Sequence, residues 1–152
     1  MITGIGHSAI RARDLELTTA FYRDVLGLKE AFRMMKDDGS GVGTIYLYIA
    51  PSQFLEIFAD GTEEFTPGPK TIGHAHICYQ VDNAAAFQEE IRAKGAPIDI
   101  ERKLGKSRCI QCWTHDPDGN RIEIMELPAD SLQAQANKRI AAEETAERRA
   151  KA

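Results

Sequence analysis

The chain has 152 residues, of which 43% are hydrophobic and 28% charged, an ordinary composition for a compact globular protein. Its 19 basic and 23 acidic residues give a net charge of −4, which argues against nucleic acid or an anionic membrane as partner and favours a small-molecule ligand. No apolar run approaches the roughly 20 residues that span a bilayer, and we recognise no signal peptide, so we expect a cytoplasmic protein.

The first half of the chain is predicted to form a strand, a helix and three more strands. Residues 3–12 have the pattern of a strand, and Asp14 is the expected cap of a helix over Leu15–Leu26 that ends at Gly27. The three strands that follow are predicted at Glu30–Lys36, Thr44–Ala50 and Gln53–Ala59. The order of elements is therefore βαβββ.

The second half repeats this order. A strand is predicted at Thr71–Val81 and a helix at Ala84–Lys94, and turn-forming residues at Asp116–Asn120 precede the last strand. The three strands after the helix are predicted at Pro97–Glu101, Arg108–His115 and Arg121–Leu127. We therefore expect an α+β fold of two tandem βαβββ modules, the first over residues 3–60 and the second over 71–127, joined by a linker at Gly61–Lys70.

The last segment, residues 129–152, is rich in alanine and charge and lacks glycine. Alanine has the highest helix propensity, so a C-terminal helix is predicted to begin near Ser131. Leu132, Ala136 and Ile140 form a thin apolar stripe that would dock one side of this helix, and its end over Glu143–Ala152 is predicted to fray.

Three cysteines, an odd number, argue against a disulfide framework. Cys109 and Cys112 have the spacing of a redox or zinc motif, but there is no second pair, and we interpret both as core residues.

Two glutamates interrupt apolar strands at corresponding places. Glu56 lies within Phe54–Phe58, and Glu123 lies on the last strand of the second half. A carboxylate among apolar neighbours is costly unless it is paired or binds a metal. Each module therefore ends in a strand with a candidate metal ligand.

The opening strands carry histidines that could complete a metal site. His7 lies on the first strand, and both His74 and His76 lie on the strand that opens the second half. His7 precedes Asp14 by seven residues and His76 precedes Asn83 by seven, so His76 corresponds to His7 in the repeat. Two histidines and two glutamates suit a divalent ion.

The chain resembles the vicinal oxygen chelate superfamily, which includes glyoxalases, bleomycin resistance proteins and dioxygenases, and within it bacterial glyoxalase I enzymes most closely, over about residues 3–127. The segments that carry the resemblance are His7–Asp14, Phe21–Leu28, Phe54–Phe58, His76–Asp82 and Asp116–Glu123. The resemblance implies a single domain over residues 1–128, with sheets curled around a metal held by His7, Glu56, His76 and Glu123. It also implies a homodimer whose sites are assembled from paired modules, often across the subunit interface.

The resemblance further implies a lyase or isomerase reaction in which a proton moves at a carbon next to a carbonyl. A divalent ion stabilises the enediolate formed by such a step. Glu56 and Glu123 would flank the reacting carbons, and Glu123 is the candidate for the principal base. Because short chains like this one resemble the nickel- or cobalt-activated bacterial glyoxalases, the resemblance favours Ni²⁺ or Co²⁺, while Zn²⁺, Mn²⁺ and Fe²⁺ remain alternatives.

Arg11 and Asp60 are the candidate substrate-binding residues. Arg11 lies on the strand face of His7, and glyoxalase I enzymes carry at this position an arginine that binds a glutathione carboxylate. Asp60 stands where those enzymes typically have an asparagine, and its charge would repel the same carboxylate.

Three other functions stay open at this point. An epimerase of the same superfamily would act on an acyl-CoA or a sugar-like hydroxy ketone. An extradiol dioxygenase would use iron held by two histidines and one carboxylate, and four protein ligands make this less favoured. A non-enzymatic resistance protein would bind its ligand in an apolar cleft without metal ligands.

Overall fold

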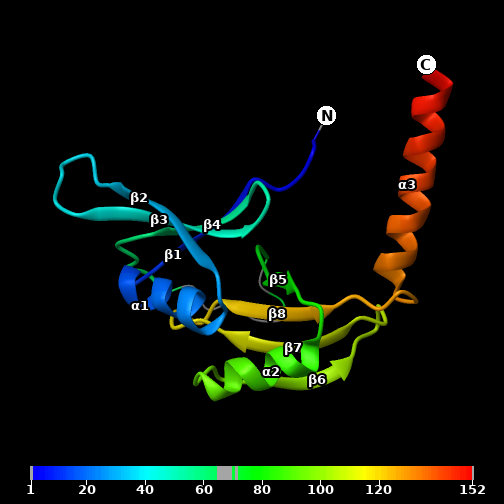
Figure 1. Cartoon of the computed structure of the whole chain (residues 1–152). Helices are drawn as coiled ribbons and strands as arrows, with labels where there is room; N and C mark the ends of the chain where they lie inside the picture. Colours follow the sequence, from blue (N-terminus) through cyan, green and yellow to red (C-terminus); the bar gives the residue numbers. More distant parts are fainter. Residues whose placement is uncertain (1, 65–69, 71, 152) are drawn as a thin grey trace. The chain divides into compact units, whose positions relative to one another are not determined.

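The computed structural model describes residues 2–64, 70 and 72–151 (Figure 1). It forms two compact units, each built around a four-stranded mixed sheet. The first unit contains Met1–Ala75 together with Lys94–Ala96 and His115–Asn120, and the second contains the remainder of the chain. The predicted α+β fold of two repeated strand and helix arrangements with a C-terminal helix is confirmed. Within the described residues, no helix is long and apolar enough to cross a membrane.

The first unit has the strand order β1-β4-β3-β2. Its elements are β1 (His7–Arg11), α1 (Leu15–Ala20), the π-helical segment η1 (Phe21–Val25), β2 (Lys29–Met35), β3 (Val42–Ala50) and β4 (Gln53–Phe58). The strand β1 pairs with β4 in parallel, and the other neighbours pair antiparallel. The first strand is shorter than the predicted 3–12 because its ladder extends only from Phe54 to Phe58 of β4.

The helix of the first unit begins where the sequence predicts. The Asp14 carboxylate accepts a hydrogen bond from the backbone N–H of Leu17 and so caps the first turn of α1. After Ala20 the helix widens into η1, where Leu26 N–H donates to the carbonyl of Phe21. The helix stops at Gly27, whose φ of +81° suits glycine.

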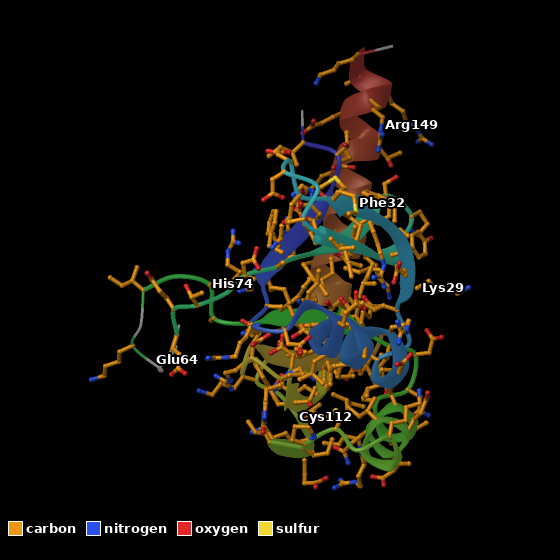
Figure 2. The ribbon with its side chains drawn as sticks, turned by 90° about the vertical axis from the view of Figure 1, so that its left-hand side faces the viewer. Lys29, Phe32, Glu64, His74, Cys112 and Arg149 are labelled. Atoms are coloured by element: carbon orange, nitrogen blue, oxygen red, sulfur yellow. The ribbon has the colours of Figure 1, made fainter. Side chains whose placement is uncertain are left out.

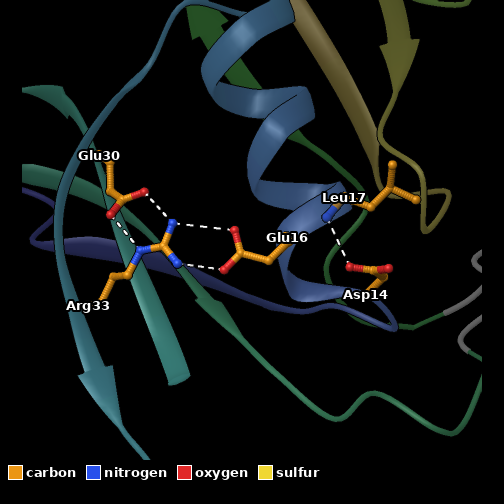
Figure 3. Close-up of polar contacts among 5 residues, drawn as sticks. All are labelled: Asp14, Glu16, Leu17, Glu30 and Arg33. Atoms are coloured by element: carbon orange, nitrogen blue, oxygen red, sulfur yellow. Dashed lines mark hydrogen bonds and ion pairs between the residues drawn. The ribbon is translucent and has the colours of Figure 1, made fainter. Parts of the chain in front are cut away.

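The core of the first unit lies between the helix and one face of the sheet. Tyr22, Ile45, Leu47, Leu55 and Ile57 are completely buried. At the edge of this layer, Arg33 on β2 binds Glu30 on its own strand and Glu16 on α1, as Figure 3 shows. The helix therefore occupies one face of the sheet, which leaves the other face for the side chains of alternate residues.

The second unit repeats this arrangement with the strand order β5-β8-β7-β6. Its elements are β5 (Ile77–Gln80), α2 (Ala84–Ala93), β6 (Ile100–Leu104), β7 (Ile110–His115), β8 (Arg121–Glu126) and α3 (Leu132–Lys151). Ala84 and Ile91 of α2 and Ile122 and Ile124 of β8 are completely buried.

Two strand predictions in the second half are wrong in extent. The strand β6 lies at Ile100–Leu104 rather than 97–101, because its ladder is set by the pairs Lys103–Gln111 and Leu104–Ile110 next to the turn that follows. The strand β5 starts at Ile77, where its parallel pairing with β8 begins. Residue 71 of the predicted strand and residues 65–69 of the predicted linker lie outside the described residues.

The C-terminal helix α3 begins next to Ser131, as predicted, and the Ser131 hydroxyl accepts a hydrogen bond from Ala134 N–H. The predicted fraying after residue 143 is wrong, because the helix continues to Lys151 with ion pairs such as Arg139 with Glu143 four residues apart. The apolar stripe does not dock: none of the described side chains of α3 is buried, and Leu132 is 56% exposed.

The described cysteines are free thiols. Cys109 and Cys112 are completely buried, which confirms their interpretation as core residues, and Figure 2 labels Cys112 on β7. Cys109 Sγ lies 3.0 Å from Gln133 Oε1.

Candidate metal centre

Glu56 belongs to the face of the first sheet that α1 does not cover. Along β4, Leu55 and Ile57 are completely buried in the core, so Glu56 points to the opposite side. The strand registers place eleven side chains of the four strands on this side, which we call the glutamate face. They are His7, Ala9 and Arg11 of β1, Phe54, Glu56 and Phe58 of β4, Thr44, Tyr46 and Tyr48 of β3, and Phe32 and Met34 of β2.

His7 and Glu56 form the first histidine–glutamate pair. Ala9 is the register partner of Glu56, so His7 lies two residues before that partner and on the same face. His7 Nε2 is 3.4 Å from Glu56 Oε2, and the glutamate side chain is only 8% exposed while the imidazole is 52% exposed. A buried carboxylate is thus presented beside an accessible ring nitrogen.

His76 and Glu123 form an equivalent pair in the second unit. Cys78 is the register partner of Glu123, and His76 lies two residues before it, as His7 does relative to Ala9. His76 Nε2 is 3.1 Å from Glu123 Oε2. His74, the other histidine of the predicted strand, lies in the segment before β5 and is exposed (Figure 2).

The two pairs fit a divalent metal ion in chemistry and in spacing. Imidazole nitrogen and carboxylate oxygen are the ligands that Zn²⁺, Ni²⁺ and Co²⁺ accept. Two atoms bound to one ion at about 2.1 Å lie about 3.0 to 3.4 Å apart for ligand angles between square and tetrahedral. The separations of 3.4 and 3.1 Å match this span. Within residues 2–64, 70 and 72–151, no three such side chains gather at one point, so each pair offers two ligands.

Tyr46 is a residue of this site that the sequence analysis missed. It is the register partner of Glu56 on β3, and its hydroxyl donates to Glu56 Oε1 at 2.7 Å. This hydrogen bond raises the pKa of the Tyr46 hydroxyl, which keeps it a neutral donor. The alternation of Thr44, Tyr46 and Tyr48 along the sequence predicts that these side chains share one face of the strand, but it does not predict which tyrosine faces Glu56.

Cys78 and Trp113 flank the second pair. The ring of Trp113 meets His76 edge-on, with centroids 4.7 Å apart, and the Arg121 guanidinium lies over the same indole at 4.6 Å. Partial burial of the Cys78 thiol, followed by the charge of Glu123, raises the pKa of that thiol to about 12. Cys78 therefore remains a neutral thiol beside the glutamate at neutral pH.

Arg11 lies on the glutamate face, where Nη1 donates to the Ala59 carbonyl at 2.9 Å and the guanidinium sits 5.2 Å from the Phe58 ring centre. Asp60, two residues beyond β4, is paired with Lys36, whose Nζ lies 2.6 Å from Oδ2. Lys36 and Asp60 both line an open surface hollow of about 420 Å³. The charge of Asp60 is thus offset by a lysine, which weakens the expected repulsion of a substrate carboxylate.

Known proteins are similar to this chain in sequence and in fold. Residues 4–124 match the family model of the Glyoxalase/Bleomycin resistance protein/Dioxygenase superfamily. The chain is 30% identical over 127 residues to a lactoylglutathione lyase of Salmonella typhimurium, covering 79% of this chain and 90% of that protein. It is 25% identical over 128 residues to a mitochondrial methylmalonyl-CoA epimerase of Mus musculus, covering 81% of this chain and 71% of that protein. The crystal structure of a glyoxalase family protein from Enterococcus faecalis aligns with a TM-score of 0.70 at 23% identity, covering 82% of this chain and 98% of that one.

Proposed function

The chain belongs to the Glyoxalase/Bleomycin resistance protein/Dioxygenase superfamily, and from this premise we propose that it is a metal-dependent lyase or isomerase of the glyoxalase I type. The reaction moves a proton at a carbon next to a carbonyl of a small metabolite. One observation carries the proposal: a histidine and a glutamate lie within 3.4 Å of each other at equivalent places in both repeats.

The proposed ligands are His7 and Glu56 from the first module and His76 and Glu123 from the second. Because each pair supplies two ligands, a set of four needs a first module and a second module together. The two modules would belong either to one chain or to the two chains of a homodimer. A bound divalent ion, for which we favour Ni²⁺ or Co²⁺, would act as a Lewis acid toward the oxygen atoms beside the reacting carbons.

The two carboxylates are the proposed proton-transferring groups. Glu123 removes the proton from the carbon next to the carbonyl and returns it to the neighbouring carbon, and Glu56 is the corresponding carboxylate of the first module. The imidazoles of His7 and His76 do not need to change protonation in this scheme. They act as neutral nitrogen donors.

For substrate binding we propose Arg11 on the glutamate face, with Asp60 at the end of β4. Arg11 offers a fixed cation to a carboxylate or phosphate, because its Nη1 is already held by the Ala59 carbonyl. Because Asp60 is already paired with Lys36, its charge does not exclude an anionic substrate such as a glutathione adduct.

A second candidate, an epimerase acting on an acyl-CoA, is favoured by the similarity to methylmalonyl-CoA epimerase. Both candidates share the proton abstraction step and differ in the carbon to which the proton returns. Proton exchange therefore tests the common step, and the compound that exchanges tells the two apart.

The experiment incubates metal-loaded protein in deuterated water with a panel of hemithioacetals, acyl-CoAs and keto sugars and follows C–H loss by NMR. We expect exchange and product formation with a hemithioacetal. If protons exchange only in the acyl-CoAs, the protein is an epimerase and the lyase proposal is wrong. Exchange with none of the panel by a protein that retains its metal would contradict the proposed function.

A further inference from the structure

Tyr46 holds one oxygen of the Glu56 carboxylate and leaves the other to the ligand pair. Its hydroxyl donates to Oε1 at 2.7 Å, while Oε2 lies 3.4 Å from His7 Nε2. A short hydrogen bond to an ionised carboxylate is stronger than one between neutral groups. Because the Glu56 side chain is only 8% exposed, water offers little competition for Oε1.

The Tyr46 ring is itself fixed by aromatic neighbours. It stacks on Phe32 with centroids 4.4 Å apart and planes inclined by 17°. It also meets His7 and Phe54 edge-on, at 6.0 and 6.3 Å. Rotation of the ring would break these contacts, so the hydroxyl is aimed at Glu56 by packing as well as by its own hydrogen bond.

The second module has a different residue at the corresponding place. Tyr46 precedes Glu56 by ten residues, and Trp113 precedes Glu123 by the same interval. Trp113 contacts His76 edge-on, as Tyr46 contacts His7, so the aromatic position is retained. An indole has no hydroxyl. On its other side Glu123 faces the thiol of Cys78 on β5, where Glu56 faces Ala9 on β1. The two glutamates therefore have unlike surroundings.

We propose that Tyr46 is a positioning residue for Glu56: its hydroxyl orients the carboxylate so that Oε2 is presented together with His7 Nε2 to a divalent ion. This inference rests on the proposed function, since it assigns Glu56 as a metal ligand. Groups that orient a metal ligand typically change metal affinity about 10- to 100-fold when they are lost. The Glu123 carboxylate interacts instead with the Cys78 thiol, so the two carboxylates are held by different partners.

The test titrates Ni²⁺ or Co²⁺ alone into the metal-free full chain by calorimetry, for the wild type and for Tyr46→Phe. The substitution removes the hydroxyl and keeps the ring that stacks on Phe32. We expect the dissociation constant to rise about 10- to 100-fold. Tyr48→Phe is the matched control, because Tyr48 lies on the same strand and face but opposite Phe54, and it should leave the affinity within about twofold of the wild type.

Two further measurements separate positioning from a purely structural role. In a Glu56→Gln background, Tyr46→Phe should cause little further loss of affinity, because the oriented ligand is already gone. The visible absorption spectrum of the Co²⁺-loaded protein should change in Tyr46→Phe and stay unchanged in Tyr48→Phe.

The outcomes are distinguishable. If the wild type binds no metal, the proposed function fails and this inference fails with it. If the wild type binds metal and Glu56→Gln weakens binding, but Tyr46→Phe matches the wild type in affinity and Co²⁺ spectrum, the positioning role alone is overturned. If Tyr46→Phe lowers the metal affinity equally in the wild type and in Glu56→Gln, the positioning role is also overturned, because the hydroxyl would then act independently of Glu56.

Discussion

Replacement of Asp116 by alanine is expected to destabilise the first unit strongly. Asp116 is 1% exposed, and its carboxylate accepts from Tyr22 Oη, Asp118 N–H, Asn120 N–H and Asn120 Nδ2 at 2.8 to 3.0 Å. Hydrogen bonds to a charged group contribute about 1.5 to 3 kcal/mol each, but bonds that share one carboxylate do not add. We expect a loss of about 3 to 5 kcal/mol in the free energy of unfolding.

The assay is urea unfolding with Tyr22→Phe and Asp118→Ala as comparisons. Tyr22→Phe removes one of the four bonds and should cost about 1 to 2 kcal/mol. Asp118 is only partly buried, and its carboxylate accepts hydrogen bonds from Arg13 N–H and Thr18 Oγ1. Asp118→Ala should therefore lower the free energy of unfolding by less than Asp116→Ala does. If Asp116→Ala unfolds within about 1 kcal/mol of the wild type at an unchanged denaturant slope, the buried carboxylate does not organise this turn.

Glu123, Cys78 and the helix α3 each offer a further test. Glu123→Gln should slow substrate proton exchange by about 10²- to 10⁴-fold while urea unfolding stays close to that of the wild type, and an active variant would remove Glu123 as the base. Alkylation of Cys78 at pH 8 should be slow because its thiol pKa is raised to about 12, and Glu123→Gln, which removes a charge that raises this pKa, should speed the reaction. An unchanged alkylation rate in that variant would contradict the contact between the two side chains. Truncation after Ala136 should change the free energy of unfolding by less than about 1 kcal/mol, since α3 buries none of its described side chains, and a larger loss in urea unfolding would mean that the helix packs in solution.

The repeat made the histidine–glutamate pairs accessible to sequence reasoning. Strand alternation identifies Glu56 and Glu123 as polar residues opposite a core face, and the interval from His7 to Asp14 and from His76 to Asn83 aligns the histidines. The structure adds the reason: each histidine lies two residues before the register partner of its glutamate on a parallel neighbour strand. Local pattern and pairing geometry agree at these positions.

The partners across the sheet could not be predicted in this way. Whether Tyr46 or Tyr48 faces Glu56 depends on the register between β3 and β4, which the turn at Pro51 and Ser52 sets and which shifts between Tyr48 and Ala50. Lys36 reaches Asp60 from the end of another strand, a contact that no local pattern contains. The strand β6 was misplaced for a related reason, because its polar sequence lacks alternation and its position follows from the turn before β7.

Metal retention measures most directly whether both histidine–glutamate pairs bind one metal ion, as we propose. The protein is loaded with excess Ni²⁺ or Co²⁺, desalted and analysed for metal per chain, for the wild type and for His7→Ala and His76→Ala. We expect one ion per chain in the wild type and loss of that ion in either variant. Wild-type protein that retains no ion, or retention that depends on only one of the two histidines, would contradict it.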